Sequence, residues 1–172
     1  MAYQPTWESV STHPLPEWYD DVKLGVFLHW GLYSVPGWAP QVGDIRQLLH
    51  DEGPVGMLRD NPYAEWYRNT MQLKGSPTQL HHAQTYGADF PYDGFIPAFN
   101  AGANSADLDA IADLCSSAGA GYVVLTTKHH EGFRLWPSSL PHPSKGLYNA
   151  ERDIVGDMSA AVRAQTIATR CW

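Results

Sequence analysis

Two short apolar runs constrain the fold of this chain more than any other feature. They occupy residues 22–30 (VKLGVFLHW) and 122–127 (YVVLTT). The first run ends in His29 and Trp30 before Gly31, and the second is followed by His129, His130 and Gly132. Continuous runs of this length, rich in Val, Leu and Phe, predict buried strands rather than helices, and such strands are typical of parallel sheets. The sequence therefore predicts an α/β protein.

Helical patterns stand on either side of the second run. Ser105 and Asp107 are suitable N-caps for a helix over residues 108–118, Gly119 would end that helix, and residues 152–164 repeat an apolar stripe at helical spacing. Strand, long connection, helix and strand is the order found in parallel β/α units. We therefore expect two strands joined by crossover helices.

Two other stretches carry few signals of regular structure. Residues 33–63 are interrupted repeatedly by Gly and Pro, and residues 86–104 are rich in aromatic side chains without a clear period. Both are expected to be irregular, since Gly and Pro are the strongest local breakers of helices and strands. Between them, residues 64–73 (AEWYRNTMQL) predict a short helix that ends before the Gly, Ser and Pro of residues 75–77.

The end of the chain departs from the β/α order. A third strand should follow the helix predicted over residues 152–164, but residues 165–172 (QTIATRCW) contain no apolar run. The sequence therefore predicts two strands with an open sheet edge. We divide the chain into a partial domain over residues 1–164 and a divergent tail over residues 165–172.

Composition excludes several classes of function. The chain has 172 residues, 11 Lys plus Arg and 18 Asp plus Glu, for a formal net charge of −7, and no basic run that would follow a phosphate backbone. Nucleic acid is therefore not expected as a partner. No apolar run of about 18 residues could span a bilayer, and the first 12 residues lack the pattern of a signal peptide. A membrane role is not expected.

Three histidines lie at the predicted strand ends. His29 lies at the end of the first apolar run, and His129 and His130 follow the second. Because ligands bind at the carboxyl ends of parallel strands, these side chains are expected to converge. A metal-dependent hydrolase is one alternative, but neighbouring histidines on a strand would point to opposite sides and no HExxH motif is present, so we predict no metal. Structural histidines bonded to backbone carbonyls are the other alternative.

A carboxylate beside aromatic residues forms a second candidate. Glu65 precedes Trp66 and Tyr67, and sugar sites combine such acceptors of hydroxyl hydrogens with flat apolar rings. The alternative is a solvated charge on a surface helix. The second histidine pair, His81 and His82, follows a predicted turn in a polar stretch and is expected at the surface.

Three segments together are similar to one known family. Residues 17–38 (EWYDDVKLGVFLHWGLYSVPGW), 64–67 (AEWY) and 118–136 (AGAGYVVLTTKHHEGFRLW) resemble family 29 α-L-fucosidases, in particular the animal lysosomal type. The likeness extends from about Tyr3 to about Arg163. It implies the N-terminal part of a (β/α)8 TIM barrel, covering less than half of the catalytic domain of that family.

The resemblance also implies roles for individual residues. His29, Glu65, His129 and His130 correspond to residues that hold the hydroxyls of the fucose ring, and Trp66 to part of the pocket wall. The family uses no metal or cofactor, acts on fucosylated glycans, and includes lysosomal or secreted enzymes. Oligomers of the full-length protein are compatible with this resemblance.

Retaining glycosidases need a carboxylate nucleophile and an acid/base carboxyl about 5 Å apart. By the resemblance, both lie beyond residue 172. Two hypotheses follow: the protein is a retaining α-L-fucosidase represented here by a part without these two residues, or the chain is a non-catalytic fragment that binds sugar weakly at most.

Overall fold

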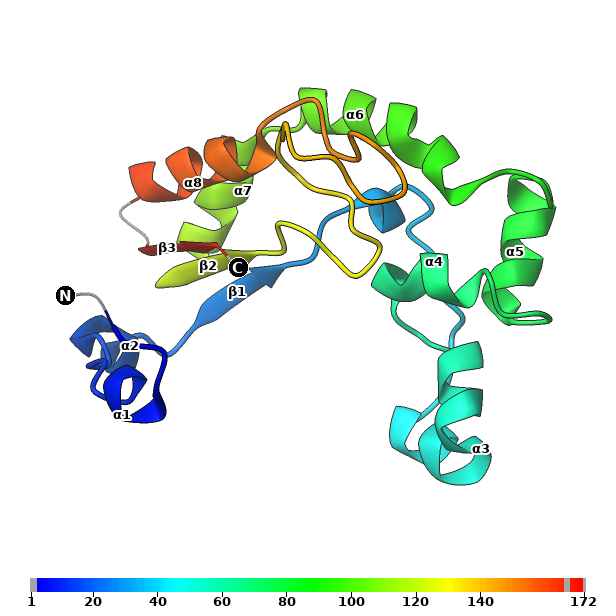
Figure 1. Ribbon diagram of the computed structural model, residues 1–172, viewed down its shortest axis with the longest axis horizontal. Coiled ribbons are helices and arrows are strands. Elements are labelled where there is room, and N and C mark those ends of the chain that lie inside the picture. Colours follow the sequence, from blue (N-terminus) through cyan, green and yellow to red (C-terminus); the bar gives the residue numbers. More distant parts are fainter. Residues whose placement is uncertain (1–2, 166–167, 172) are drawn as a thin grey trace.

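A computed structural model describes residues 3–165 and 168–171 of the chain. Three strands and a series of helices follow one another in the order expected of β/α units (Figure 1). The elements are α1 Trp7–Val10, α2 Glu17–Asp21, β1 Gly25–Leu28, η1 Leu32–Ser34, α3 Ile45–Arg59, η2 Ala64–Trp66, α4 Tyr67–Thr70, α5 Pro77–Thr85, η3 Tyr92–Phe95, α6 Ile96–Ser105, α7 Leu108–Ser117, β2 Tyr122–Leu125, α8 Ile154–Ala164 and β3 Ala168–Cys171.

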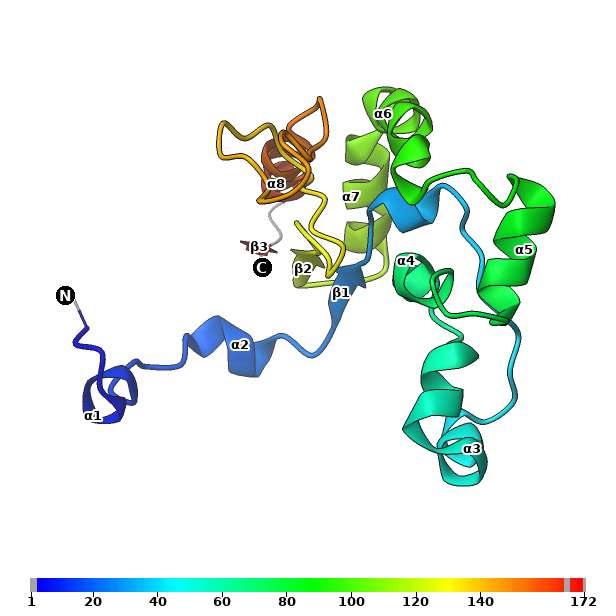
Figure 2. The same cartoon turned by 45° about the vertical axis from the view of Figure 1, so that its right-hand side comes forward.

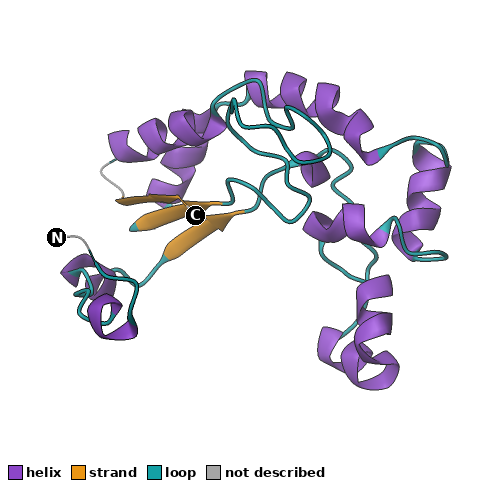
Figure 3. Ribbon diagram, viewed as in Figure 1, coloured by secondary structure: helices purple, strands orange, loops and turns teal. Residues whose placement is uncertain are grey.

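The described strands form one parallel sheet in the order β1-β2-β3 (Figure 3). Gly25 pairs with Tyr122 and Leu28 with Leu125, so that β1 and β2 are level at both ends. The Tyr122 ring lies close over Gly25, and a Cβ atom there would be 2.1 Å from that ring, so the ring would have to move. The predicted parallel α/β arrangement is confirmed, and both predicted strands are present.

The sheet has a third strand that the sequence analysis did not expect. β3 pairs in parallel with β2 from Ala168 to Cys171, so the prediction of only two strands was wrong. A parallel ladder is made by backbone groups, and a short edge strand does not need an apolar run to form it. The helix α8 returns the chain to the sheet edge, where the backbone of β2 offers its remaining hydrogen bonds.

Helices α7 and α8 cover one face of the sheet (Figures 1 and 3). Asp107 caps α7 by accepting from the backbone N–H of Ala110, and Gly119 follows its end with φ of +81°. The core between helices and sheet consists of buried apolar side chains: Leu108, Ala112, Cys115, Val123, Leu125, Ile154, Met158 and Val162. On the other face, Phe27 of β1 is 58% exposed.

Regular structure extends into both stretches that were predicted to be irregular. The helix α3 begins at the N-cap Asp44 and is kinked at Gly53, where φ is +68°, just before Pro54. In the second stretch η3 and α6 follow one another. The predictions failed because Gly and Pro here cap, kink and begin helices instead of excluding them.

Figure 2 shows α3 and α1 at opposite ends of the molecule.

The segment between β2 and α8 is a long loop that folds back onto the sheet. The backbone N–H of Leu135 donates to Thr127 O at 2.9 Å, and that of Ile154 donates to Leu135 O at 3.0 Å. Gly132 turns the chain with φ of +89°, and a Cβ atom there would lie 3.1 Å from His142 Nε2. The loop is thereby fixed to the ends of the strands.

Candidate functional site

The candidate site begins where β1 and β2 end together. The backbone N–H of Thr126 donates to Leu28 O at 2.9 Å, which continues the ladder past the last paired residues. His29, which directly follows β1, therefore lies beside the segment that carries His129. The centroids of the two rings are 6.0 Å apart. The His29 ring also stacks on Phe27 at 4.8 Å.

His129 and His130 lie on the same side of their loop. Their ring centroids are 4.8 Å apart, and Trp66 lies 6.4 Å from the first and 5.2 Å from the second. The expectation that neighbouring histidines point to opposite sides was wrong, because β2 has ended at Leu125 and strand alternation no longer applies.

A small pocket of about 120 Å³ lies between this loop and the segment that carries η2 and α4. Its lining includes four of the five residues predicted to bind sugar; the full set is Glu65, Trp66, Arg68, Asn69, Gln72, His129, His130 and Glu131. His29 is not in this lining but contacts His129 from β1. Pockets for drug-sized ligands are about 300–1,000 Å³, so this pocket is suited to a single small ring.

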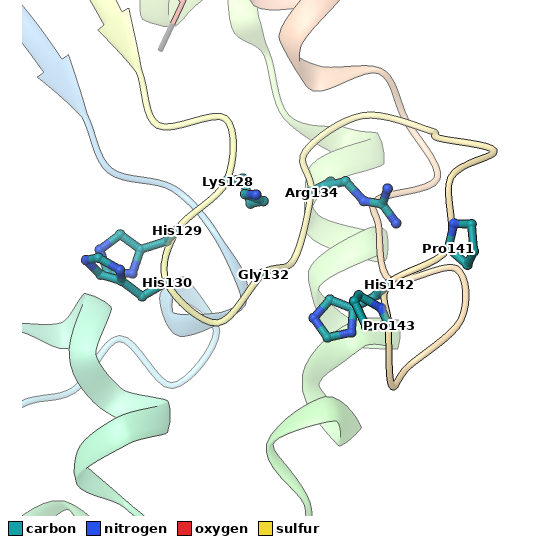
Figure 4. A pocket seen from close by; sticks show the side chains of 8 residues that line it. All are labelled: Lys128, His129, His130, Gly132, Arg134, Pro141, His142 and Pro143. Carbon is teal, nitrogen blue, oxygen red and sulfur yellow. The ribbon is translucent and has the colours of Figure 1, made fainter.

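A wider cavity of about 610 Å³ lies on the other side of the loop and shares His129 and His130 with the small pocket. Figure 4 shows the two imidazoles together on one side of the loop, while Arg134 and His142 lie across from them. The guanidinium of Arg134 donates to Ser138 Oγ and to Leu140 O, so it also holds the far part of the loop. His129 and His130 thus lie between the small pocket and the wider cavity.

Glu131 is a site residue that the sequence analysis missed. It is 6% exposed, and burial raises the pKa of its carboxyl to about 7, against smaller opposing effects of its own backbone N–H, Arg68 and Lys145. Its Oε2 lies 3.4 Å from His129 Nδ1. The only sequence signal was its place directly after the two histidines, in a position where a charged residue is usually solvated.

The surroundings of His129 favour its uncharged form. Burial lowers the pKa of His129, and His130 and His29 lower it further, while Glu65 opposes them. Tyr33 of η1 is also buried against His129, with ring centroids 5.4 Å apart. Burial raises the pKa of its hydroxyl, and the carboxylates of Glu131 and Glu65 add to this. An uncharged imidazole offers one donor and one acceptor, which suits hydroxyl ligands.

The other histidine pair does not lie where the sequence predicted. His82 of α5 is 3% exposed, so its expected surface position was wrong. Its Nδ1 is 3.0 Å from Tyr67 Oη and its Nε2 is 2.8 Å from Phe90 O. His81 is partly exposed and stacks on Trp38 at 4.1 Å. The cap of Ser76 and the N-terminal Pro77 begin a helix in this polar stretch, and that helix buries one of the two rings.

Within residues 3–165 and 168–171, no group of three or more His, Cys, Asp or Glu side chains is arranged to hold a metal ion. Among the same residues, no helix is long and apolar enough to cross a membrane.

Parallel strands joined by helices, with a pocket at the carboxyl ends of the strands, define the class of α/β proteins that bind ligands at this edge. The chain belongs to the alpha-L-fucosidase family, whose model matches residues 1–171.

Named relatives and solved structures agree with this membership. The alpha-L-fucosidase of Dictyostelium discoideum is 36% identical over 95% of this chain and 32% of its own length. The human tissue alpha-L-fucosidase is 37% identical over 96% of this chain and 30% of its own. A Thermotoga maritima alpha-fucosidase solved in complex with fucose has a TM-score of 0.81 at 41% identity, covering 99% of this chain and 37% of that one. The chain therefore spans about a third of the length of these relatives.

Proposed function

We propose that this chain holds an α-L-fucosyl group in the small pocket at the ends of β1 and β2. The observation that carries the proposal is the convergence of Glu65, Trp66, His129 and His130 around one space, with His29 against His129. These residues come from distant parts of a chain that belongs to the fucosidase family. Their arrangement fits a ligand that presents several hydroxyls and one apolar face.

The chemistry of each side chain supports that ligand. A neutral imidazole supplies one donor and one acceptor, whereas the Glu65 carboxylate only accepts. The Trp66 indole lies beside both imidazoles and offers a flat apolar wall for a sugar face. A deoxy sugar needs both kinds of contact, because hydroxyls and a methyl group project from the same ring.

We further propose that the sheet is the first part of a (β/α)8 barrel. Successive strands are parallel and adjacent in chain order, as in such barrels. Helices α7 and α8 cover one face, and the exposed Phe27 lies on the face that a barrel would enclose. The likeness to the Thermotoga maritima structure over nearly the whole chain supports the same assignment.

For the protein as a whole, we propose a retaining α-L-fucosidase that acts on fucosylated glycans in a lysosomal or secreted location. The relatives named tissue and plasma alpha-L-fucosidases support both the activity and the location. Retention requires two carboxyl groups about 5 Å apart, and we assign neither role to the residues described here. The alternative is a non-catalytic chain that binds sugar only weakly.

Binding and turnover test these statements separately. Titration of the 172-residue chain with L-fucose, followed by NMR, should perturb the signals of His129 and His130, and L-rhamnose should perturb them much less. Glu65→Gln should weaken binding, whereas His50→Ala, whose side chain is 83% exposed, should leave binding unchanged. Absence of any fucose effect would reject the pocket. Turnover of an aryl α-L-fucoside by this chain would show that the assignment of the catalytic carboxyls is wrong.

A further inference from the structure

The innermost polar groups of the site are two neighbouring side chains of the same loop. His129 Nδ1 and Glu131 Oε2 are 3.4 Å apart, and the two side chains are 11% and 3% exposed. Among the residues that the structure describes, neither Nδ1 nor either carboxyl oxygen has a hydrogen-bond partner. Buried polar groups normally have partners, and the separation is short enough for a small rotation to join these two.

We propose that Glu131 is a positioning residue that selects the tautomer of His129 and so decides whether Nε2 of that ring donates to the sugar or accepts from it. The proposal rests on the proposed function of the pocket. Carboxyl groups that bind the second nitrogen of a functional histidine fix its tautomer in many sites. Here Nδ1 faces Glu131, which leaves Nε2, on the opposite side of the ring, for the ligand.

The proton count defines two forms of the pair. When the carboxyl is protonated, its O–H donates to Nδ1, and the neutral ring carries its own proton on Nε2, which is then a donor. When the carboxyl has lost its proton, it accepts from Nδ1–H, and Nε2 becomes an acceptor. The two forms differ by one proton, which is released to solvent as pH rises.

The donor form should bind the sugar more tightly. Glu65 only accepts, so a hydroxyl that gives its hydrogen to Glu65 still has lone pairs that need a donor. A pKa of about 7 for Glu131 places the exchange between the two forms near neutral pH. The lowered pKa of His129 favours the uncharged ring in both.

Several other groups face the Glu131 carboxyl. They come from η1, α4, η3 and the loop after β2, and they are Tyr33, Arg68, Tyr92, Lys145 and Tyr148. The tyrosines have raised pKa values because they are buried, so they stay neutral through pH 9. The two cations favour the charged carboxyl. Three further titratable groups face His129 itself, namely His29 from the end of β1, Glu65 from η2 and His130 from the same loop. The comparison with Glu131→Gln separates the contribution of Glu131 from theirs.

Nitrogen-15 NMR of the imidazoles in the intact chain tests the tautomer directly. The His129 signals are assigned by their loss in His129→Phe and followed from pH 5.5 to 8.5. We expect Nδ1 to change from unprotonated to protonated as pH rises through about 7, and Nε2 to change in the opposite sense. One tautomer across the whole range would overturn the proposal, and this measurement needs no variant of Glu131.

The variant Glu131→Gln tests the cause. A glutamine amide imitates the protonated carboxyl, so His129 should keep its proton on Nε2 at every pH. Fucose binding by the unaltered chain should weaken about tenfold between pH 5.5 and 8.5, as expected for the loss of one hydrogen bond, while binding by Glu131→Gln should stay constant. The exposed Glu8→Gln serves as control and should follow the unaltered chain.

The two levels of the proposal fail in different ways. If fucose perturbs no histidine while the tautomer of His129 still changes with pH, the pocket assignment is wrong and the Glu131 pair is real. If fucose binds but the pH dependence is the same in Glu131→Gln, the positioning role is wrong and the pocket stands.

Discussion

The chain contains two histidine pairs, and they have opposite hydrogen-bond states. In the first pair, the buried His82 ring has a partner at both nitrogens, Tyr67 Oη and Phe90 O. In the second, the half-buried His129 has a buried Nδ1 without a hydrogen-bond partner among the described residues. Both pairs pack against aromatic rings, so packing alone does not distinguish them.

The comparison separates a structural histidine from a functional candidate. Burying a polar group without a partner costs free energy of folding, so native cores satisfy nearly all such groups. Departures from this rule gather at functional sites, where a ligand or a change of protonation completes the bonding. His82 follows the rule and His129 departs from it, together with Glu131 and the hydroxyl of Tyr33.

The largest expected effect concerns His82, whose two ring nitrogens both have hydrogen-bond partners. His82→Ala should lower the free energy of unfolding by roughly 3–4 kcal/mol, because it leaves a cavity and two buried polar groups without a partner. Urea denaturation measures the loss. The matched control His81→Ala, which removes a partly exposed neighbour, should cost less than about 1 kcal/mol. Equal losses in the two variants would contradict the structural role of His82.

The second prediction concerns the Glu131 carboxyl, which is buried without a hydrogen-bond partner among the described residues. The pKa of Glu131 in the folded chain, about 7, is above its ordinary value of 4.5, so the folded state holds the proton more firmly than the unfolded state. Its contribution to stability is complete below pH 4.5 and is lost as pH rises through 7. This loss should reach roughly 3 kcal/mol by pH 8.5.

Denaturation at a series of pH values isolates that contribution when the chain is compared with Glu131→Gln, which cannot ionise at this position. The difference in unfolding free energy between the two proteins should change between pH 5.5 and 8.5 in favour of the variant. A constant difference would show that the carboxyl already titrates normally in the folded state.

The third prediction separates binding from stability. His129→Ala should weaken fucose binding about tenfold or more, since it removes a hydrogen bond in the pocket. It should change the free energy of unfolding less than His82→Ala does, because Nδ1 has no hydrogen-bond partner within the part of the chain that the structure describes. Calorimetric titration and urea denaturation of the same samples give both numbers. A variant that loses stability and keeps its affinity would place His129 with His82 among structural residues.

Part of the fold and of the candidate site could be predicted from the sequence. Both strands, the Asp107 cap and helices α7 and α8 depend on local patterns and were predicted correctly. The adjacency of His29 and His129 followed from the rule that parallel strands end together. Neither the burial of His82 nor that of Glu131 could be predicted, because each depends on how side chains of other elements pack around a polar residue.

The same reason accounts for the missed elements. β3 is held by backbone pairing with β2, which leaves no mark in the composition of residues 168–171. In residues 33–63, the signals for a loop were in fact an N-cap at Asp44 and a kink at Gly53 within α3. Gly and Pro restrict the backbone locally, but only the surrounding structure decides whether a restricted position interrupts a helix or begins one.

The smallest expected effect concerns His81, the neighbour of His82. His81 stacks on Trp38 with ring centroids 4.1 Å apart and planes 3° from parallel. A double-mutant cycle of His81→Ala and Trp38→Leu should give a coupling of about 0.5–1 kcal/mol, the range of aromatic pairs beyond their buried area. Fucose binding should not change in any of the variants. A change in binding would mean that the pair of His81 and His82 also reaches the pocket, which would contradict the distinction between the two pairs.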